Sequence, residues 1–212
     1  MPDTLNEQTL NTFLAALASS APTPGGGSVA SLSGAMAAGL VSMVCSLTIG
    51  KKQFAEIEGE VRGIQGRAEG LRRELQALAQ EDMEVFGRLS AAYKLPRTTD
   101  ADAASRQAAI QKVTQAAAEV PLRTAQAAVA LIPLCTFLAS RCSRLIVSDI
   151  GVAALLARAT VQSAVLNVEI NLSGLEDKIF VREARARIED MIIGLGEEAE
   201  GILKIVRSRI NG

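Results

Sequence analysis

A glycine-rich loop in the first quarter of the chain is the first candidate for a functional site. Residues 22–28 read P-T-P-G-G-G-S, and an uncharged run follows from Val29 to Gly50. Consecutive glycines leave the backbone N–H groups uncovered, and a helix N-terminus attracts anions. The sequence therefore predicts an anion-binding loop that leads into a buried helix, with Ser28 as the N-cap.

A second candidate, Asp82, stands where the pattern of its own helix calls for an apolar residue. Apolar positions in alternating steps of four and three predict one long helix from Phe54 to about Tyr93. A buried carboxylate needs a partner or a shifted pKa, and either property suits proton transfer. The alternative is that the helix bends and that Asp82 lies in water. The seam that Asp82 interrupts consists of Ile57, Val61, Ile64, Ala68, Leu71, Leu75, Leu78, Val85 and Leu89.

Two lysines follow the uncharged run together, at positions 51 and 52. Cations at a helix C-terminus complement its dipole, and for Lys51 and Lys52 this structural role is the simpler interpretation. Further along, Ser148 is expected to cap a helix that carries Asp149 in its first turn.

That helix also carries two asparagines near its end. Asn167 lies eighteen residues after Asp149, which is five turns, so the two share one face of a straight helix. Asn171 follows one turn later. The simpler interpretation of both asparagines is that backbone groups satisfy their amides.

The composition excludes several classes of site. The chain has 212 residues, a net charge of −1 and no histidine. Without histidine it lacks the usual general base, the commonest metal ligand and any Ser-His or Cys-His pair. The small net charge gives no case for binding nucleic acid or an acidic membrane. Three cysteines without C-x-x-C spacing, Cys45, Cys135 and Cys142, predict a reduced cytoplasmic protein.

The same composition predicts the fold class. Hydrophobic residues make up 49% of the chain but aromatic residues only 3%, which favours helices packed closely through small side chains. No strand alternation is visible. We therefore expect one all-α domain over residues 1–212, a bundle of long antiparallel helices.

Boundary signals divide this bundle into helices. Thr4 and Glu7 fit a capping box at the start of a first helix. Pro121 is expected to start a helix and Pro133 to kink or break it. Residues 175–211 are expected to form a helix pair or one long helix. Val29–Gly50 is the candidate membrane span, but its many hydroxyl groups favour a buried helix of a soluble protein.

Four stretches carry a resemblance that none of them would carry alone. They are P-T-P-G-G-G-S at 22–28, M-V-x-x-L-T-x-G-K-K at 43–52, S-D-x-G-V-A at 148–153 and N-V-x-I-N-L at 167–172. Together they resemble the cyclodeaminase/cyclohydrolase family, which includes the C-terminal domain of formiminotransferase-cyclodeaminase and free-standing methenyltetrahydrofolate cyclohydrolases. The resemblance implies an all-α homodimer that binds a folate substrate, with or without a polyglutamate tail, near the dimer interface. It implies no metal and no organic cofactor.

The chemistry that the resemblance implies assigns roles to the candidates. Cyclohydrolysis adds water to the methenyl carbon of a cationic folate and opens the ring at N5, which requires a base and an acid. Asp82 is the first candidate for proton transfer, with Lys52 as its partner or as a donor to the adduct. Asp149 suits the adjacent N–H donors of a pterin. The expected substrate-binding residues are Pro24, Gly25, Gly26, Gly27, Ser28, Lys51, Ser148, Asp149 and Asn167.

The sequence is compatible with more than one activity. The first expectation is hydrolysis of 5,10-methenyltetrahydrofolate to 10-formyltetrahydrofolate, in one-carbon metabolism, which a free-standing chain favours. The alternative is cyclodeamination, the loss of ammonia from 5-formiminotetrahydrofolate. The family often has G-N-x-N before the S-D pair, whereas Cys142–Val147 contains no asparagine. This departure keeps a non-catalytic folate-binding protein as a third possibility.

Overall fold

Helices make up almost all of the part of the chain that the computed structural model describes, residues 5–212, and this part contains no strand. The all-α prediction is therefore confirmed. Thr4, in the expected capping box, lies outside the described residues, and the first α-helix begins later, with Thr9 as its N-cap. The α-helices are α1 (Leu10–Leu17), α2 (Gly26–Thr48), α3 (Glu58–Tyr93), α4 (Asp100–Val129), α5 (Ile132–Arg141), α6 (Val147–Leu172), α7 (Lys178–Ile192) and α8 (Leu195–Asn211). Short 3-10 helices lie at Leu5–Glu7, Lys52–Ile57 and Arg144–Ile146.

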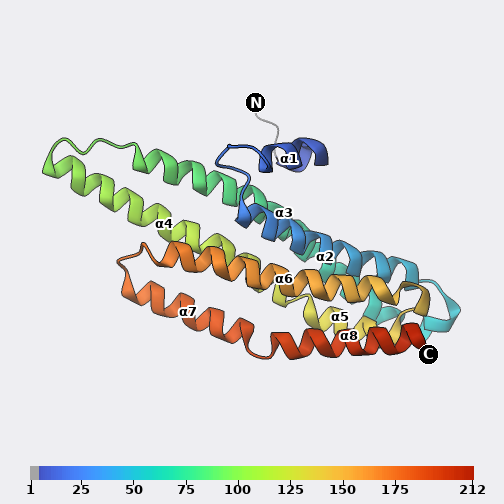
Figure 1. Ribbon diagram of the computed structural model, residues 1–212. Coiled ribbons are helices and arrows are strands. Elements are labelled where there is room, and N and C mark those ends of the chain that lie inside the picture. Colours follow the sequence, from blue (N-terminus) through green and yellow to red (C-terminus); the bar gives the residue numbers. More distant parts are fainter. Residues whose placement is uncertain (1–4) are drawn as a thin grey trace.

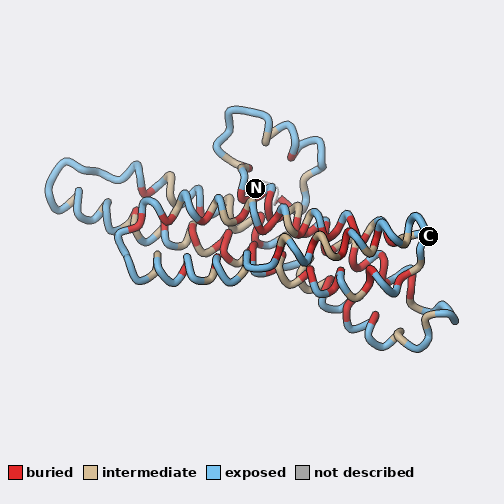
Figure 2. Tube along the Cα trace, turned by 60° about the horizontal axis from the view of Figure 1, so that its bottom comes forward, coloured by how far each residue is buried: buried red, intermediate tan, exposed pale blue. Residues whose placement is uncertain are grey.

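Four long helices form the body of the molecule. Helix α2 packs against α3 and α6, and α4 packs against the same two helices, so the four close into a bundle (Figure 1). Helices α5 and α8 cover one end of α6, and α7 runs back beside α4. Buried residues follow the middle of the bundle, whereas the tip where α3 leads into α4 is exposed (Figure 2).

Small residues let α2 pack closely against its neighbours in this bundle. Gly34 illustrates the fit, because a Cβ there would lie 3.1 Å from side-chain carbons of Leu75 on α3 and Thr160 on α6. Apolar residues of α2, α3, α4, α5, α6 and α8 then join in one large buried cluster. The glycines of α3 are different: no neighbouring atom lies within 4 Å of a Cβ built at Gly59, Gly63, Gly66 or Gly70.

Two serines expected to cap helices lie inside them instead, and α3 begins at Glu58 rather than Phe54, after a 3-10 helix. Helix α2 begins at Gly26 with Gly25 as its N-cap, so Ser28 lies inside the first turn. Helix α6 begins at Val147, after a 3-10 turn that Ser143 caps with its side chain, so Ser148 also lies inside its helix. In both places the chain enters the helix earlier than the serine, which frees the serine hydroxyl for other contacts.

The expected helix start at Pro121 is also wrong, because α4 continues through this proline. A proline inside a helix lacks the N–H that would bond the carbonyl oxygen four residues earlier, which here belongs to Ala117. The side chain of Asn171 on α6 donates to that oxygen at 3.0 Å. The neighbouring helix thus replaces the missing hydrogen bond, and α4 needs no break until Ala130 and Leu131, just before Pro133.

Within residues 5–212, three segments are long and apolar enough to cross a membrane by length and composition, rather than the one expected. They are Gly26–Thr48, Asp100–Arg141 and Arg144–Leu172. The first and second have 61% of their most apolar window buried inside the protein, and the third has 44%. Core packing therefore accounts for much of their apolar character.

Candidate functional site

A cavity of about 370 Å³ lies at the glycine end of α2, where α2, α3, α4 and α6 meet. Among the described residues that line it, Asp82 is the only one with an ionisable side chain. The lining residues are Pro22, Thr23, Gly25, Gly26, Gly27, Asp82, Val85, Phe86, Leu89, Ala117, Val120, Asn167, Ile170 and Asn171. The structure therefore brings the glycine loop, Asp82 and Asn167 together, although 54 and 85 residues of chain separate Ser28 from Asp82 and Asp82 from Asn167.

The Asp82 carboxylate is half-buried against the first turn of α2. The hydroxyl of Ser28 donates a hydrogen bond to Oδ2 of Asp82 at 2.8 Å. A Cβ at position 27 would overlap Oδ1 of Asp82, so only glycine lets the carboxylate approach this closely. The positive end of the α2 dipole faces the same group. The anion that this helix start binds within the chain is thus the carboxylate of Asp82.

Burial raises the pKa of the Asp82 carboxyl above its usual range. The hydrogen bonds from the side chain and the backbone of Ser28 act in the opposite direction, because they favour the charged form, and they offset the effect of burial only in part. Asp82 is therefore a carboxyl that takes up a proton more readily than an exposed aspartate does.

The two asparagines on the α6 side of the cavity are anchored by backbone oxygens. Nδ2 of Asn167 donates to the carbonyl of Ser163 at 2.8 Å, and Nδ2 of Asn171 donates to the carbonyls of Ala117 and Asn167. This is the simpler of the two interpretations made from the sequence. Because the Nδ2 groups are used in this way, the Oδ1 atoms are what the two side chains can offer to a ligand.

The other predicted residues lie at the opposite end of the bundle. Helices α2 and α6 are antiparallel, because Gly26 approaches Asn167 while Gly34 approaches Thr160. Lys51 and Lys52, just beyond the end of α2, therefore lie on the order of 30 Å from Asp82, at 1.5 Å of rise per residue. The expected pairing of Lys52 with Asp82 is not made within one chain.

Ser148 and Asp149 share that distant end, at the start of α6. The segment Cys142–Val147, where the family often has G-N-x-N, leads directly into them and does not line the cavity. At the cavity itself, Pro24 and Ser28 are buried and do not line it, so Ser28 acts on the site through Asp82.

The apolar wall of the cavity contains residues that the sequence reasoning did not single out. Phe86 and Leu89 follow Asp82 by one and two turns of α3, and Ile170 lies on α6. Phe86 and Ile170 keep exposed fractions of 41% and 70%. Spacing from Asp82 on its helix would have pointed to Phe86 and Leu89, and the spacing of Ile170 from Asn167 on α6 would have placed it near the same site.

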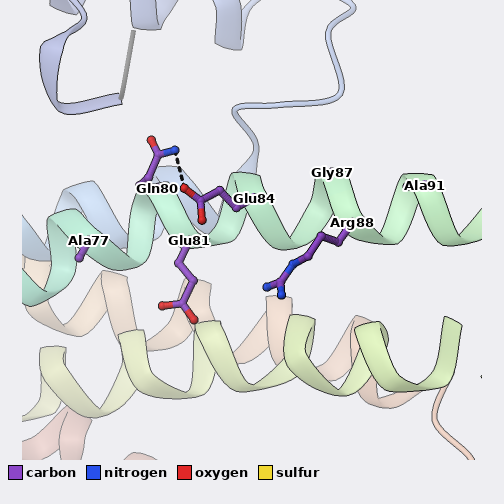
Figure 3. Close-up of a pocket in the computed structure, with 7 residues that line it drawn as sticks. All are labelled: Ala77, Gln80, Glu81, Glu84, Gly87, Arg88 and Ala91. Atoms are coloured by element: carbon purple, nitrogen blue, oxygen red, sulfur yellow. Dashed lines mark hydrogen bonds between the residues drawn. The ribbon is translucent and has the colours of Figure 1, made fainter. Parts of the chain in front are cut away.

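A larger and shallower hollow of about 870 Å³ lies along α3, and two of its residues, Glu81 and Arg88, point towards α4 (Figure 3). Its residues are mostly exposed, and three of its polar side chains are engaged with each other or with α4. Gln80 donates to Glu84 at 2.9 Å, and Arg123 of α4 donates to Glu81 at 2.9 Å. None of the predicted site residues lines it, so volume alone does not identify the functional site.

Neither the acidic residues nor the thiols form a metal centre in the described part of the chain. No group of three or more Cys, Asp or Glu side chains is placed there to hold an ion. Cys45, Cys135 and Cys142 are buried and free, and burial raises the pKa of Cys45 and of Cys135 to about 12. Such thiols stay protonated and act as packing groups.

The fold and the site define a class of protein: a helical bundle in which the glycine-rich start of one helix faces a half-buried carboxylate. The sequence model of the family Formiminotransferase-cyclodeaminase matches residues 9–190. The chain belongs to this family.

Individual relatives match nearly the whole chain. A methenyltetrahydrofolate cyclohydrolase of Methylorubrum extorquens is 43% identical over 96% of this chain and 98% of its own length. A formimidoyltransferase-cyclodeaminase of Sus scrofa is 33% identical over 94% of this chain, which spans only 37% of that longer protein. The crystal structure of a formiminotetrahydrofolate cyclodeaminase from Thermotoga maritima matches with a TM-score of 0.82 and 30% identity, covering 98% of each chain.

The raised pKa of Asp82 predicts that its charge costs stability at neutral pH. Between the usual aspartate pKa of about 4 and the higher folded-state pKa, the folded protein binds more protons than the unfolded chain. Stability contributed by this group therefore falls as the pH rises through that window and stays lowered above it. We expect Asp82→Asn to raise the free energy of unfolding at pH 7, and this gain to shrink as the pH falls towards 4. Urea unfolding at several pH values measures it.

The matched control is Glu84→Gln, which neutralises an exposed carboxylate on the same helix. A loss of stability in Asp82→Asn at pH 7, or a gain of the same size at every pH, would contradict the interpretation.

Proposed function

We propose that this protein is a methenyltetrahydrofolate cyclohydrolase, which hydrolyses 5,10-methenyltetrahydrofolate to 10-formyltetrahydrofolate. The observation that carries the proposal is the position of Asp82. Within residues 5–212 it is the only ionisable side chain that lines the cavity, beside backbone, hydroxyl, amide and apolar groups. The 43% identity to the Methylorubrum cyclohydrolase over nearly the full length of both chains supports the choice of reaction. We also propose that the reaction takes place in the cytoplasm and uses neither a metal nor an organic cofactor.

Asp82 matches the charge changes of this reaction. The substrate carries a positive charge spread over N5, the methenyl carbon and N10, and a carboxylate nearby stabilises it. The oxygen of water bonds to the methenyl carbon while Asp82 takes one water proton, which leaves a neutral hydroxyl adduct. Asp82 then gives its proton to N5 as the bond between carbon and N5 breaks. The adduct hydroxyl becomes the formyl oxygen and releases its proton to solvent, so one water is consumed and one proton is released.

The rest of the cavity suits the ring system of a folate. The side-chain oxygens of Asn167 and Asn171 are acceptors for the N–H groups of a pterin, and Phe86 offers a ring face to a flat ligand. The backbone around Gly25 and Gly26, which is not shielded by side chains, can approach the ligand closely. We propose that these groups orient the methenyl carbon towards Asp82.

Cyclodeamination is the second candidate, and the match to a solved cyclodeaminase structure supports it. The Thermotoga chain matches this one over 98% of both lengths, and it is a cyclodeaminase. A chain of this size is therefore compatible with either reaction. Contrary to the expectation from the sequence, the length of the chain does not favour hydrolysis over cyclodeamination. Both reactions pass through a tetrahedral carbon between N5 and N10 and both need proton transfer.

The two activities are separated by assaying the purified protein with each substrate. We expect it to accelerate the loss of methenyl absorbance from 5,10-methenyltetrahydrofolate well above the rate in buffer. We expect little release of ammonia from 5-formiminotetrahydrofolate. Ammonia release without faster methenyl decay would replace the cyclohydrolase by the cyclodeaminase. The absence of both activities would overturn the proposal.

We propose further that the protein is a homodimer whose interface includes the exposed faces of α2 and α6. Large apolar side chains are exposed on both of these neighbouring helices, at spacings that place each set on one helix face. They are Val29, Met36, Met43 and Leu47 on α2, and Val152, Leu155, Leu166 and Ile170 on α6. Ile170 belongs both to this surface and to the wall of the cavity, so the interface would border the site.

A dimer of this kind would bring the two ends of the bundle together. A two-fold axis that crosses α2 at a right angle places the helices of the two copies antiparallel. The lysine end of α2 from one copy then lies beside the glycine end of α2 from the other. Lys52 and Asp149 of a second copy could thus complete the site around Asp82, which reconciles the predicted residues with their separation in one chain.

Mixing two inactive variants tests this arrangement. We expect Asp82→Asn and Lys52→Ala each to be nearly inactive alone. Mixed dimers would contain one site with both native residues, so dissociating and re-pairing equal amounts should restore about a quarter of the wild-type activity with random pairing. Rates of methenyl decay measure the recovery, and re-paired Asp82→Asn alone serves as the control. A mixture with no more activity than its components, or a monomeric mass at micromolar concentration, would contradict the shared site.

A further inference from the structure

Ser28 has two acceptors within reach of one buried hydroxyl. Its side chain lies inside the first turn of α2 and has an exposed fraction of 0%. The Oγ atom is 2.8 Å from Oδ2 of Asp82 and 3.3 Å from the carbonyl oxygen of Ala79, one turn earlier on α3. A hydroxyl has one hydrogen, so the shorter contact, to the carboxylate, takes it while Asp82 is charged.

The strength of the hydrogen bond from Ser28 to Asp82 depends on the charge of Asp82, whereas that of the hydrogen bond from Ser28 to Ala79 does not. When Asp82 takes up a proton, Oδ2 becomes either a hydroxyl or a neutral carbonyl oxygen, and both accept more weakly than a carboxylate. The carbonyl oxygen of Ala79 has a second lone pair available beside its helical hydrogen bond. The hydroxyl of Ser28 therefore keeps a partner in both states, which avoids the cost of an unsatisfied buried polar group.

We propose that Ser28 is a positioning residue for proton transfer: its buried hydroxyl holds the Asp82 carboxylate against the start of α2, in the orientation that faces the cavity. This inference rests on the proposed function, because it concerns the proton that Asp82 carries during hydrolysis. Gly27 contributes the space and Ser28 the hydrogen bond, so two neighbouring residues of one helical turn fix the same carboxylate.

Other charged groups near Asp82 do not account for its raised pKa. Helix α2 has no charged residue between Gly26 and Thr48, and α1 has none. The charged groups on α3, α4, α6 and α7 closest to this region along the chain are Glu81 with its partner Arg123, the exposed Glu84, Glu119 with its partner Arg187, and the exposed Glu169. None of them is among the causes that shift the pKa of Asp82, which are burial and the hydrogen bonds from Ser28.

A matched pair of serine variants tests the proposal directly. Ser28→Ala removes the hydroxyl that reaches Asp82. Ser31→Ala removes a hydroxyl that is equally buried, one turn further along α2, and that is bonded to Thr124 at 2.9 Å. The pKa of Asp82 is read from its side-chain carboxyl carbon by NMR titration of the free protein. We expect Ser28→Ala to raise this pKa by about one pH unit, because the charged form loses a hydrogen bond. We expect Ser31→Ala to leave it unchanged.

Kinetics then distinguish positioning from a purely structural role. In Ser28→Ala the acid limb of the pH profile for methenyl hydrolysis should move upwards by the same amount as the pKa. The value of kcat on the plateau should fall about tenfold with little change in KM, and Ser28→Thr, which keeps a hydroxyl, should recover most of it. An unchanged Asp82 pKa in Ser28→Ala, or an equal shift in Ser31→Ala, would overturn the proposal. If wild-type protein hydrolysed no methenyl substrate while the titration gave the expected shift, the proposed function would fail and the coupling between Ser28 and Asp82 would stand.

Discussion

The close approach of the Asp82 carboxylate to the first turn of α2 is the constraint on which the rest of the site depends. Position 27 must be glycine, because any side chain would occupy the space of Oδ1. Helix α2 must also run deep in the bundle, so that the turn meets α3 at Asp82. Burial then raises the pKa of the carboxyl, while Ser28 and the helix N-terminus keep the charged form accessible. A proton-transfer group for a cationic substrate needs this balance, since it must lose and regain its proton in one cycle.

A second constraint links the wall of the cavity to the fold of α4. Pro121 leaves the carbonyl oxygen of Ala117 without its helical partner, and Asn171 of α6 supplies the hydrogen bond. Because Ala117 and Asn171 both line the cavity, the interaction that keeps α4 continuous also fixes the distance between two walls of the site. The backbone oxygens that satisfy Asn171 thus belong to two helices, and the side chain joins α6 to α4.

Much of the fold follows from local patterns, and the exceptions have physical causes. The apolar seam of α3 predicted a long helix that continues past its glycines, and Asp82 was found because it interrupts that seam. The start at Pro121 was wrong because the compensating donor comes from a helix fifty residues away, which local rules do not register. The placement of Asn167 beside the glycine loop was within reach of sequence reasoning, through the family motifs. The separation of Lys52 from Asp82 required the antiparallel packing of α2 and α6, a tertiary property.

The central claim is that Asp82 transfers the proton in folate hydrolysis. It is tested most directly by comparing turnover and folate binding in wild-type protein and Asp82→Asn, which keeps the size of the side chain and an acceptor for Ser28. The account predicts that kcat for methenyl hydrolysis falls by about 10²-fold or more, while the dissociation constant of a folate changes only a few-fold. Turnover in Asp82→Asn equal to that of the wild type would contradict it.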